Sequence, residues 1–533
     1  MAQIQFKGKS FVQNHHLLVK YHELIPKKNK SLTDRVSLHD NLVIHGDNLK
    51  ALKALLPLYA GKIKCIYIDP PYNTGNEKWA YNDNVNSPMM QEWLGKVVDR
   101  EDLTRHDKWL CMMTPRLKLL RELLREDGVI FISIEDTEIA NLRILMDEVF
   151  GEENFLASVI WQHSIQAKGY LGKFSVHHNY LLSYQKSQGF TLEALKRTEV
   201  HNRNYSNPDN DPKGDWRSGD VRNALYRPNL IFDIKTPSGK TIKPPKNGWR
   251  WSRETIEKKL ESGEIIFSKD ESRIIRKIHL VDVKGRAPET IWFGKEVGTT
   301  REATRELKEL FEGDSPFETP KPSRLVERIL EISTDEDSGD IILDSFSGSG
   351  TTAHAVLALN KKDGGNRKFI LVECEDYADK ITAERVRRVI KSVPKAKNDN
   401  LKKGLGGTFS YFELGKAIEL ESILSGDGLP TYEELARYIF YTATGEEFDP
   451  KVMNEKKNFV GESSNYKVYL FYEQDIEKLK NIALTLERAK SLGRPGEKRR
   501  LVFAPTKYLD QAHLDELRID FAQLPFEIYE LAR

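Results

Sequence analysis

The stretch Ile63-Lys-Cys-Ile-Tyr-Ile-Asp-Pro-Pro-Tyr72 joins six mostly apolar residues to an acid, two prolines and a tyrosine. The short apolar run Ile63–Ile68 predicts a buried strand, and Gly128–Ile134 predicts a second one. The segments Lys108–Arg125 and Glu138–Phe150 have the apolar spacing of helices. Strands that alternate with helices predict an α/β fold with a Rossmann-like, doubly wound and mostly parallel sheet.

The residues Asp69, Pro70, Pro71 and Tyr72 follow the first of these strands directly. In an open α/β sheet, the carboxyl ends of the strands are where ligands bind. Each proline fixes its φ angle and has no N–H, so the turn is stiff and its carbonyls are free to accept hydrogen bonds. An acid, carbonyl acceptors and an aromatic face suit a flat ring with an exocyclic amine, which makes these four residues candidate catalytic residues. The alternative is a turn that only ends the strand.

A second motif, Asp344-Ser-Phe-Ser-Gly-Ser-Gly-Thr-Thr-Ala353, leads from the predicted strand Ile341–Leu343 into the predicted helix Thr351–Leu359. Glycines at a helix N-terminus let the backbone approach a ligand closely. Glu373 ends the next predicted strand, where an acid binds ribose hydroxyls in dinucleotide-binding folds. The pattern predicts an adenosine-containing cofactor. NAD, FAD and S-adenosylmethionine all remain open here, as does a purely structural turn.

Two weaker signals flank these motifs. Asp47 follows a predicted strand in Val43-Ile-His-Gly-Asp-Asn-Leu49, where it is either a ligand contact or a helix N-cap. The sequence Thr319-Pro-Lys-Pro-Ser323 opens the predicted helix Lys321–Ile332, and Ser323 is a candidate cap for it.

The charge of the chain is uneven. The formal net charge is +2, but residues 161–300 hold 25 Lys and Arg against 16 Asp and Glu. Aromatic and basic side chains alternate within this basic segment, a mixture suited to phosphate contacts and base stacking. The segment therefore predicts nucleic-acid binding, with these candidate contact residues: Arg217, Arg222, Arg227, Trp249, Arg250, Trp251 and Arg253.

Composition excludes several classes of protein. The chain is 39% hydrophobic and 30% charged, and no apolar stretch approaches the ~18 residues of a membrane span. No apolar signal segment is recognised near the start, and the three cysteines form no CxxC pair, so we expect a cytosolic protein without a metal site. The chain also lacks a GxxxxGK[ST] phosphate loop and a Pro-Cys nucleophile.

The 533 residues suggest several domains. From weakening periodicity and Gly/Pro-rich stretches we predict an N-terminal segment, a core in two parts around an irregular insert, a linker and a small C-terminal α/β domain. The predicted bounds are 1–41 for the N-terminal segment, 42–163 and 317–393 for the core, 164–316 for the insert, 394–407 for the linker and 408–533 for the C-terminal domain. Within the C-terminal domain we expect a helix over 476–492 and a strand over 526–531.

Together these motifs resemble S-adenosylmethionine-dependent amino-group DNA methyltransferases. The catalytic motif precedes the insert and the glycine-rich turn follows it, as in the β permutation of that family. By this resemblance Asp69 to Tyr72 are catalytic, an Asp first position favours adenine N6 over cytosine N4, and the insert recognises the target. The residues implied in cofactor binding are Asp47, Lys321, Pro322, Asp344, Phe346, Gly348, Gly350, Thr351 and Glu373.

The sequence is similar over nearly its whole length to Mod subunits of type III restriction-modification systems, in DPPYNTG at 69–75, IFISIED at 130–136, FGEENF at 150–155 and FETPKP at 317–322. The resemblance implies a homodimer that binds double-stranded DNA and assembles with a Res helicase-nuclease. Three alternatives stay open: an N4-cytosine methyltransferase, a dinucleotide oxidoreductase, and a catalytically silent DNA-binding protein.

Overall fold

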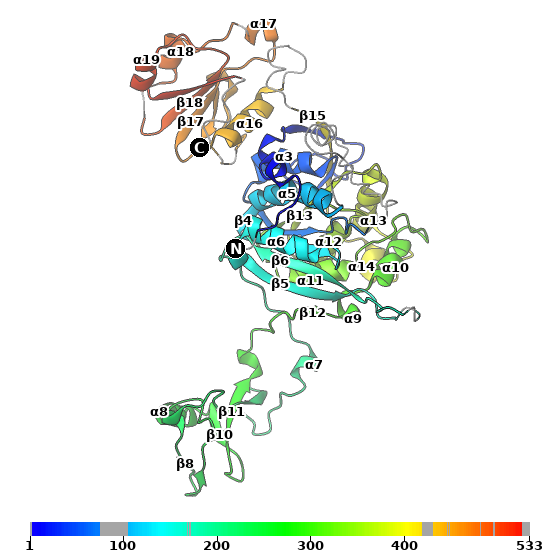
Figure 1. Cartoon of the computed structure of the whole chain (residues 1–533), viewed down its shortest axis with the longest axis vertical. Coiled ribbons are helices and arrows are strands. Elements are labelled where there is room, and N and C mark those ends of the chain that lie inside the picture. The colour runs from blue at the N-terminus through cyan, green and yellow to red at the C-terminus, as the bar shows by residue number, and fades with distance from the viewer. Residues whose placement is uncertain are drawn as a thin grey trace. The chain divides into compact units, whose positions relative to one another are not determined.

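The structure, a computed structural model, describes residues 3–74, 105–167, 169, 172–417, 430–444, 446, 448–479, 481–493 and 496–524. The chain divides into two compact units (Figure 1). The first comprises Met1–Thr191 and Glu289–Arg533, and the second comprises Leu192–Pro288. No helix among these described residues has the length and hydropathy of a membrane span.

A ten-stranded sheet forms the centre of the first unit, in the order β1-β15-β2-β14-β13-β3-β4-β6-β5-β12. The six strands from β15 to β4 run parallel to one another, whereas β1 and β6 pair antiparallel with their neighbours. The bounds are β1 His22–Pro26, β2 Leu42–His45, β3 Ile63–Ile68, β4 Leu124–Ile134, β5 Phe155–Gln162, β6 His178–Gln185, β12 Ile291–Trp292, β13 Ile341–Asp344, β14 Lys368–Glu373 and β15 Ser410–Ala417.

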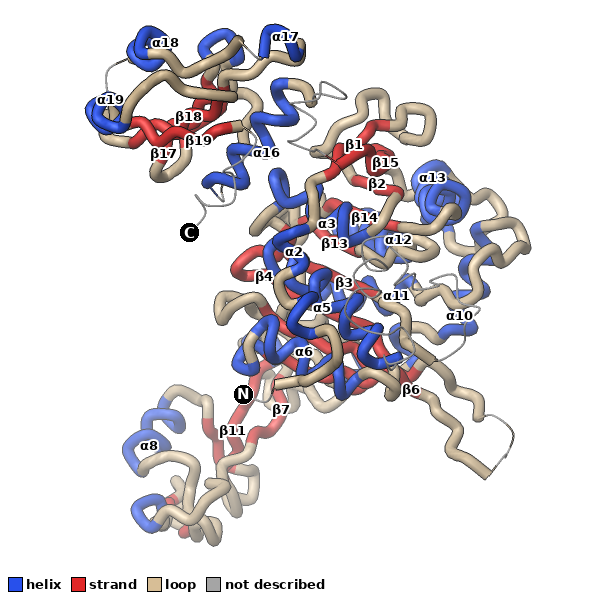
Figure 2. The backbone as a smooth tube through the Cα atoms, turned by 45° about the horizontal axis from the view of Figure 1, so that its top comes forward, coloured by secondary structure: helices blue, strands red, loops and turns tan. Residues whose placement is uncertain are grey.

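Helices cover both faces of this sheet (Figure 2). The connections from β2 to β3 and from β3 to β4 step one way across the sheet, and the connection from β13 to β14 steps the other way. Because such crossovers are right-handed, α3 and α5 lie on one face and α12 on the other. The bounds are α3 Asn48–Tyr59, α5 Arg105–Leu123, α6 Ile139–Phe150, α9 Gly294–Val297, α10 Thr300–Leu310, α11 Ser323–Glu331, α12 Thr351–Asp363 and α13 Glu384–Lys391.

The predicted fold class is confirmed. The strand β3 has the bounds Ile63–Ile68 that its apolar run predicted, and the other core helices and strands differ from the predicted bounds by only a few residues. The core of the sheet is fully buried, as the continuous apolar runs of a parallel sheet require. The two predicted motifs therefore follow adjacent parallel strands, β3 and β13.

The second unit is smaller than the predicted insert 164–316. Strands β6 and β12 fall inside those predicted bounds but join the central sheet, β6 beside β4 and β12 beside β5. Pairing partners this distant in sequence leave no local signal, which is why the bounds differ. The unit Leu192–Pro288 contains the sheet β10-β11-β7, the hairpin β8-β9 and two α-helices, with these bounds: α7 Glu199–Asn202, β7 Trp216–Gly219, β8 Ile234–Lys235, β9 Thr241–Ile242, α8 Arg253–Glu261, β10 Ile265–Phe267 and β11 Ile274–His279.

The C-terminal part also departs from its predicted bounds. The predicted linker contains the short helix α14 Asp399–Lys403, and β15 belongs to the central sheet. A separate four-stranded sheet follows, with the helix α16 Tyr432–Thr444 packed against β16 and β17; its strands are β16 Phe459–Glu462, β17 Tyr466–Leu470, β18 Arg499–Ala504 and β19 Ile519–Gln523. The single helix expected over 476–492 is two short helices, α17 Ile476–Leu479 and α18 Leu486–Ser491, because Thr485 caps the second. The strand expected over 526–531 lies outside the described residues.

Candidate active site

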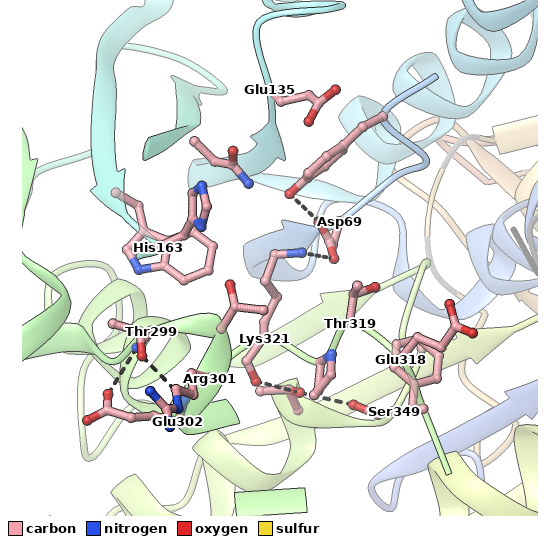
Figure 3. Close-up of a pocket in the computed structure, with 18 of the residues that line it drawn as sticks. Asp69, Glu135, His163, Thr299, Arg301, Glu302, Glu318, Thr319, Lys321 and Ser349 are labelled. Atoms are coloured by element: carbon pink, nitrogen blue, oxygen red, sulfur yellow. Dashed lines mark hydrogen bonds and ion pairs between the residues drawn. The ribbon is translucent and has the colours of Figure 1, made fainter. Parts of the chain in front are cut away.

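A cavity of about 980 Å³ opens at the carboxyl ends of β3, β4 and β13, all within the first unit (Figure 3). Residues of both predicted motifs line it. At its wall Asp69 also contacts Lys321, which is 252 positions away in the chain. The lining residues include Tyr67, Asp69, Pro70, Pro71, Tyr72, Glu135, Trp161, His163, Gln166, Arg301, Arg305, Phe317, Glu318, Lys321, Asp344, Phe346, Gly348, Ser349, Thr351 and Tyr377.

Asp69 faces this cavity with both carboxylate oxygens engaged. The Tyr72 hydroxyl donates a hydrogen bond to its Oδ1 at 2.9 Å, and the Lys321 ammonium forms an ion pair with its Oδ2. The Lys321 Nζ lies 5.1 Å from the centre of the Tyr72 ring. Burial, reinforced by the Asp69 charge, raises the pKa of Tyr72 well above its ordinary value. Tyr72 is therefore a neutral aromatic residue at neutral pH.

The carbonyl groups of the Pro-Pro turn are not equivalent. The Trp109 indole, from α5, donates its Nε1–H to the Pro71 carbonyl at 2.7 Å. Among the described residues, no donor is hydrogen-bonded to the Pro70 carbonyl. Trp109 thus fixes the turn through one carbonyl and leaves the other available at the cavity.

A buried carboxylate secures the end of the same turn. Asn73, directly after Tyr72, has a φ of 57°, a left-handed conformation that non-glycine residues adopt infrequently. Its side-chain amide donates to Glu138, which also receives His106 Nδ1 at 2.6 Å and Asn141 Nδ2 at 2.7 Å. Glu138 is 0% exposed. Neither Asn73 nor Glu138 was selected from the sequence, because no local pattern reveals a contact between residues 65 positions apart.

The glycine-rich turn satisfies its polar groups internally. Asp344 Oδ1 accepts the Phe346 N–H at 3.0 Å, and its Oδ2 accepts the Thr352 hydroxyl. Burial raises the pKa of Asp344 to about 7. Gly348 and Gly350 have φ angles of 48° and 79°, and a Cβ on Gly350 would lie 2.9 Å from the Thr382 carbonyl oxygen.

Two predicted cofactor residues lie behind this turn and do not line the cavity. Glu373 is buried, and its carboxylate accepts the N–H groups of Gly348 at 2.7 Å, Cys374 at 2.9 Å and Glu375 at 3.1 Å. Asp47 is the N-cap of α3 and accepts the Lys50 N–H at 3.1 Å. Both carboxylates therefore accept backbone hydrogen bonds within the protein. For Asp47 the structure shows the helix N-cap that was one of its two predicted roles.

The remaining predicted cofactor residues lie at or beside the cavity. The Thr351 hydroxyl donates to the Lys321 carbonyl at 3.2 Å, which joins the two segments. Pro322 is the N-cap of α11 and packs close to Gly298, where an added Cβ would lie 2.6 Å from the proline ring. Ser323 does not cap the helix, because its hydroxyl donates to Glu306.

The predicted nucleic-acid contacts all lie in the second unit, but in different environments. Trp249 is 3% exposed and donates to the Phe232 carbonyl, so it belongs to that unit's core. Arg222 is paired with Asp220, and Arg217 donates to the Tyr205 hydroxyl at 3.1 Å. The other predicted contact residues are exposed or partly exposed at the surface: Arg227, Arg250, Trp251 and Arg253.

The fold and the site define an α/β protein whose proline-stiffened acidic turn shares a cavity with a glycine-rich turn. Residues 63–384 match the DNA methylase family (N6_N4_Mtase), and the chain belongs to this family. It is 33% identical to the type III restriction-modification enzyme StyLTI Mod subunit of Salmonella typhimurium, over 76% of this chain and 65% of that protein. It is also 33% identical to the type II methyltransferase M.KpnI of Klebsiella pneumoniae, over 65% of this chain and 82% of that one.

Solved structures are more distant. A complex of M1.HpyAVI with SAM is 16% identical, covers 64% of this chain and 98% of that one, and has a TM-score of 0.28. The chain spans slightly less than two thirds of the length of the Salmonella relative, 65% of it.

Proposed function

We propose that the protein transfers a methyl group from S-adenosylmethionine to the N6 amine of a flipped adenine in double-stranded DNA. The observation that carries this proposal is the shared cavity, in which Asp69 to Tyr72 and the turn at Phe346 to Thr351 line one space of about 980 Å³. A cavity of that size has room for a methyl donor and a base side by side. Membership of the DNA methylase family supports the same reading.

The residues present fit S-adenosylmethionine. Its cationic and carboxylate groups need polar partners, and the cavity offers the Ser349 and Thr351 hydroxyls, the Lys321 ammonium and the aromatic Phe346 beside the glycine backbone. When bound, this cofactor supplies a methyl group activated by a positively charged sulfur. In the proposed complex the glycine-rich turn holds it, and Asp344 and Glu373 fix the shape of the turn by accepting its backbone N–H groups.

The target amine would bind at the acidic turn. Asp69 and the free Pro70 carbonyl each accept one N–H of the amine, and Tyr72 stacks on the base. Tyr72 and Lys321 each occupy one acceptor site, on Oδ1 and Oδ2 of Asp69, and each oxygen keeps a second lone pair that can accept the incoming amine. Flipping the base costs a few kcal/mol of unstacking, which stacking and these hydrogen bonds offset. Holding amine and donor in line then supplies much of the rate.

We further propose that the protein is the modification subunit of a type III system. Its similarity to three Mod subunits at 31–33% identity supports this. In this proposal it works as a homodimer in the cytosol, together with a Res helicase-nuclease, and the second unit grips DNA. That unit holds 21 Lys and Arg against 14 Asp and Glu, which favours a polyanionic partner.

The proposal is tested by incubating the purified protein with tritiated S-adenosylmethionine and host DNA, then identifying the labelled base. We expect N6-methyladenine, and long-read sequencing of a host genome with and without the protein gives its motif. Recovery of N4-methylcytosine would favour the alternative specificity. The variant Asp69→Ala should abolish transfer and retain DNA binding, whereas Asp399→Ala, on an exposed helix, should keep full activity. Methylation by the Asp69 variant would contradict the catalytic assignment.

A further inference from the structure

The acidic side chains of helix α10 pair with residues of other elements, whereas its two arginines at the cavity have no acidic partner among the described residues. Its sequence Thr-Arg-Glu-Ala-Thr-Arg-Glu places Arg301, Glu302, Arg305 and Glu306 as two adjacent pairs of opposite charge. From sequence alone this is a neutral, solvated helix face. In the structure the two carboxylates have partners on other elements, and the two arginines do not share them.

The Glu302 carboxylate, in the first turn of the helix, already has two partners. Its carboxylate accepts the Thr299 N–H at 3.0 Å in a capping box and pairs with Arg324 of α11 at 2.9 Å. Neither interaction involves Arg301 or Arg305, so the negative charge of Glu302 is neutralised by Arg324 and not by these two arginines.

Glu306 is turned into the protein. It pairs with Arg385 at 2.8 Å and His354 at 2.8 Å, and it accepts the Ser323 hydroxyl at 3.0 Å. Burial alone would raise the pKa of Glu306, but the charges of His354 and Arg385 lower it to about 2. The carboxylate is therefore ionised and its charge is balanced within this network.

Arg301 and Arg305 remain at the rim of the cavity. Both line it and both are exposed, whereas Tyr67, Tyr72 and Phe346 at its base are buried. Arg301 donates to the Gln166 side chain at 3.1 Å, and neither arginine has a carboxylate partner in the part of the chain that the structure describes. Figure 3 places Glu318, an acid on the rim, across the cavity from Arg301. Four residues apart on a helix, the two guanidinium groups lie on one side.

We infer that Arg301 and Arg305 bind the backbone phosphates next to the flipped nucleotide. This inference rests on the proposed function. A base that reaches Asp69 and Tyr72 is buried in the cavity, so its sugar-phosphate link must lie at the rim, where the two arginines are. Guanidinium groups match phosphate oxygens with paired hydrogen bonds. The pair thus forms a DNA contact in the first unit. The DNA contacts predicted from the sequence all lie in the second unit.

The experiment compares the wild-type protein with the double variant R301Q/R305Q and with K308Q. Lys308 is exposed on the same helix but does not line the cavity, so it controls for the loss of positive charge. The DNA is a duplex that carries the motif found by genome sequencing. The measurements are DNA affinity as a function of salt, methylation kinetics, and S-adenosylmethionine affinity without DNA.

We expect DNA affinity of the double variant to fall roughly tenfold for each arginine. The slope of log affinity against log salt should decrease by about one for each phosphate contact that is lost. Cofactor affinity without DNA should be unchanged, and K308Q should behave like the wild type.

Two results would overturn the inference. One is an unchanged DNA affinity and salt slope in R301Q/R305Q. The other is a loss of cofactor affinity in the absence of DNA, which would assign the pair to the carboxylate of the methyl donor. If the wild-type protein itself does not methylate DNA, the proposed function fails, which separates that failure from this one.

Discussion

The two turns that line the cavity differ in what their polar groups bind. The acidic turn after β3 directs Asp69 and the Pro70 carbonyl toward the cavity, and it is held by residues from other elements, Trp109 and Glu138. The glycine-rich turn after β13 is fixed by two buried carboxylates that accept its backbone N–H groups, Asp344 at its own start and Glu373 at the end of the neighbouring strand β14. The acidic turn presents its carboxylate and a free carbonyl to a ligand, whereas the carboxylates at the glycine-rich turn bind backbone N–H groups and fix its shape.

This difference predicts different consequences of mutation. Removing support from the acidic turn should slow the reaction and leave cofactor binding intact, because the amine is misplaced. Disturbing the glycine-rich turn should weaken cofactor binding or change stability. Three variants test this contrast.

The largest expected effect is on stability, in Asp344→Asn. The raised pKa of Asp344, about 7, means that the unfolded chain ionises at lower pH than the folded protein. Stability from this group is present below about pH 4 and is lost as pH rises through 7. The free energy of unfolding of the variant, minus that of the wild type, should therefore rise by ~4 kcal/mol between pH 4 and 8.

Chemical denaturation across this pH range gives the measurement. The control is Asp399→Asn, because Lys402 lowers the pKa of that exposed carboxyl and the sign is opposite. A pH-independent difference between wild type and D344N would show that Asp344 is not held as a buried acid.

The next effect is on cofactor affinity, in Gly350→Ala. Gly350 and Gly364 are the two caps of α12, and both have a φ of 79°. A Cβ at Gly350 would lie 2.9 Å from the Thr382 carbonyl oxygen, while a Cβ at Gly364 would contact nothing within 4 Å. We expect G350A to weaken S-adenosylmethionine binding on the order of a hundredfold, equal to ~2.7 kcal/mol.

The variant G364A carries similar backbone strain without the clash. Calorimetric titration of both variants should show normal cofactor affinity in G364A. Equal losses in the two would mean that strain in α12, rather than the shape of the turn, controls binding.

The smallest effect is on turnover, in Trp109→Phe. This change removes the N–H that the Pro71 carbonyl accepts and should reduce kcat about tenfold, equal to ~1.4 kcal/mol. Cofactor affinity should not change. Trp292 is also buried and donates to a backbone carbonyl, that of Glu289, but Glu289, unlike Pro71, does not line the cavity. The variant W292F should therefore keep its kcat, and a loss of cofactor affinity in W109F would contradict the contrast between the turns.

Much of the central sheet could be predicted from local sequence. The runs at Ile63–Ile68 and Ile341–Leu343 are mostly apolar because parallel strands are buried on both faces; the first has the bounds of β3, and the second ends one residue before β13 does. The predicted insert was too long because β6 and β12 join the sheet by pairing with distant strands. The prediction of a single helix over 476–492 was wrong because Thr485 caps a second helix, α18, within that range.

Site residues divide in the same way. The acidic turn, the glycine-rich turn and Lys321 were visible as motifs, and all line the cavity. Glu373, the predicted ribose ligand, accepts three backbone N–H groups in the structure, and its role in cofactor binding stays a prediction. Trp249 was expected to contact DNA, yet it packs in a core. Residue type shows what a side chain can bind but not whether folding has already satisfied it.

The sequence by itself determined the strands, the two turns and the chemistry that their residues can perform, because these depend on neighbours along the chain. Only the tertiary structure decided that Lys321 pairs with Asp69, that Glu138 holds Asn73, and that α10 leaves two arginines at the cavity rim. Such contacts join residues far apart in sequence. They form only when the sheet brings the carboxyl ends of β3, β4 and β13 to one edge.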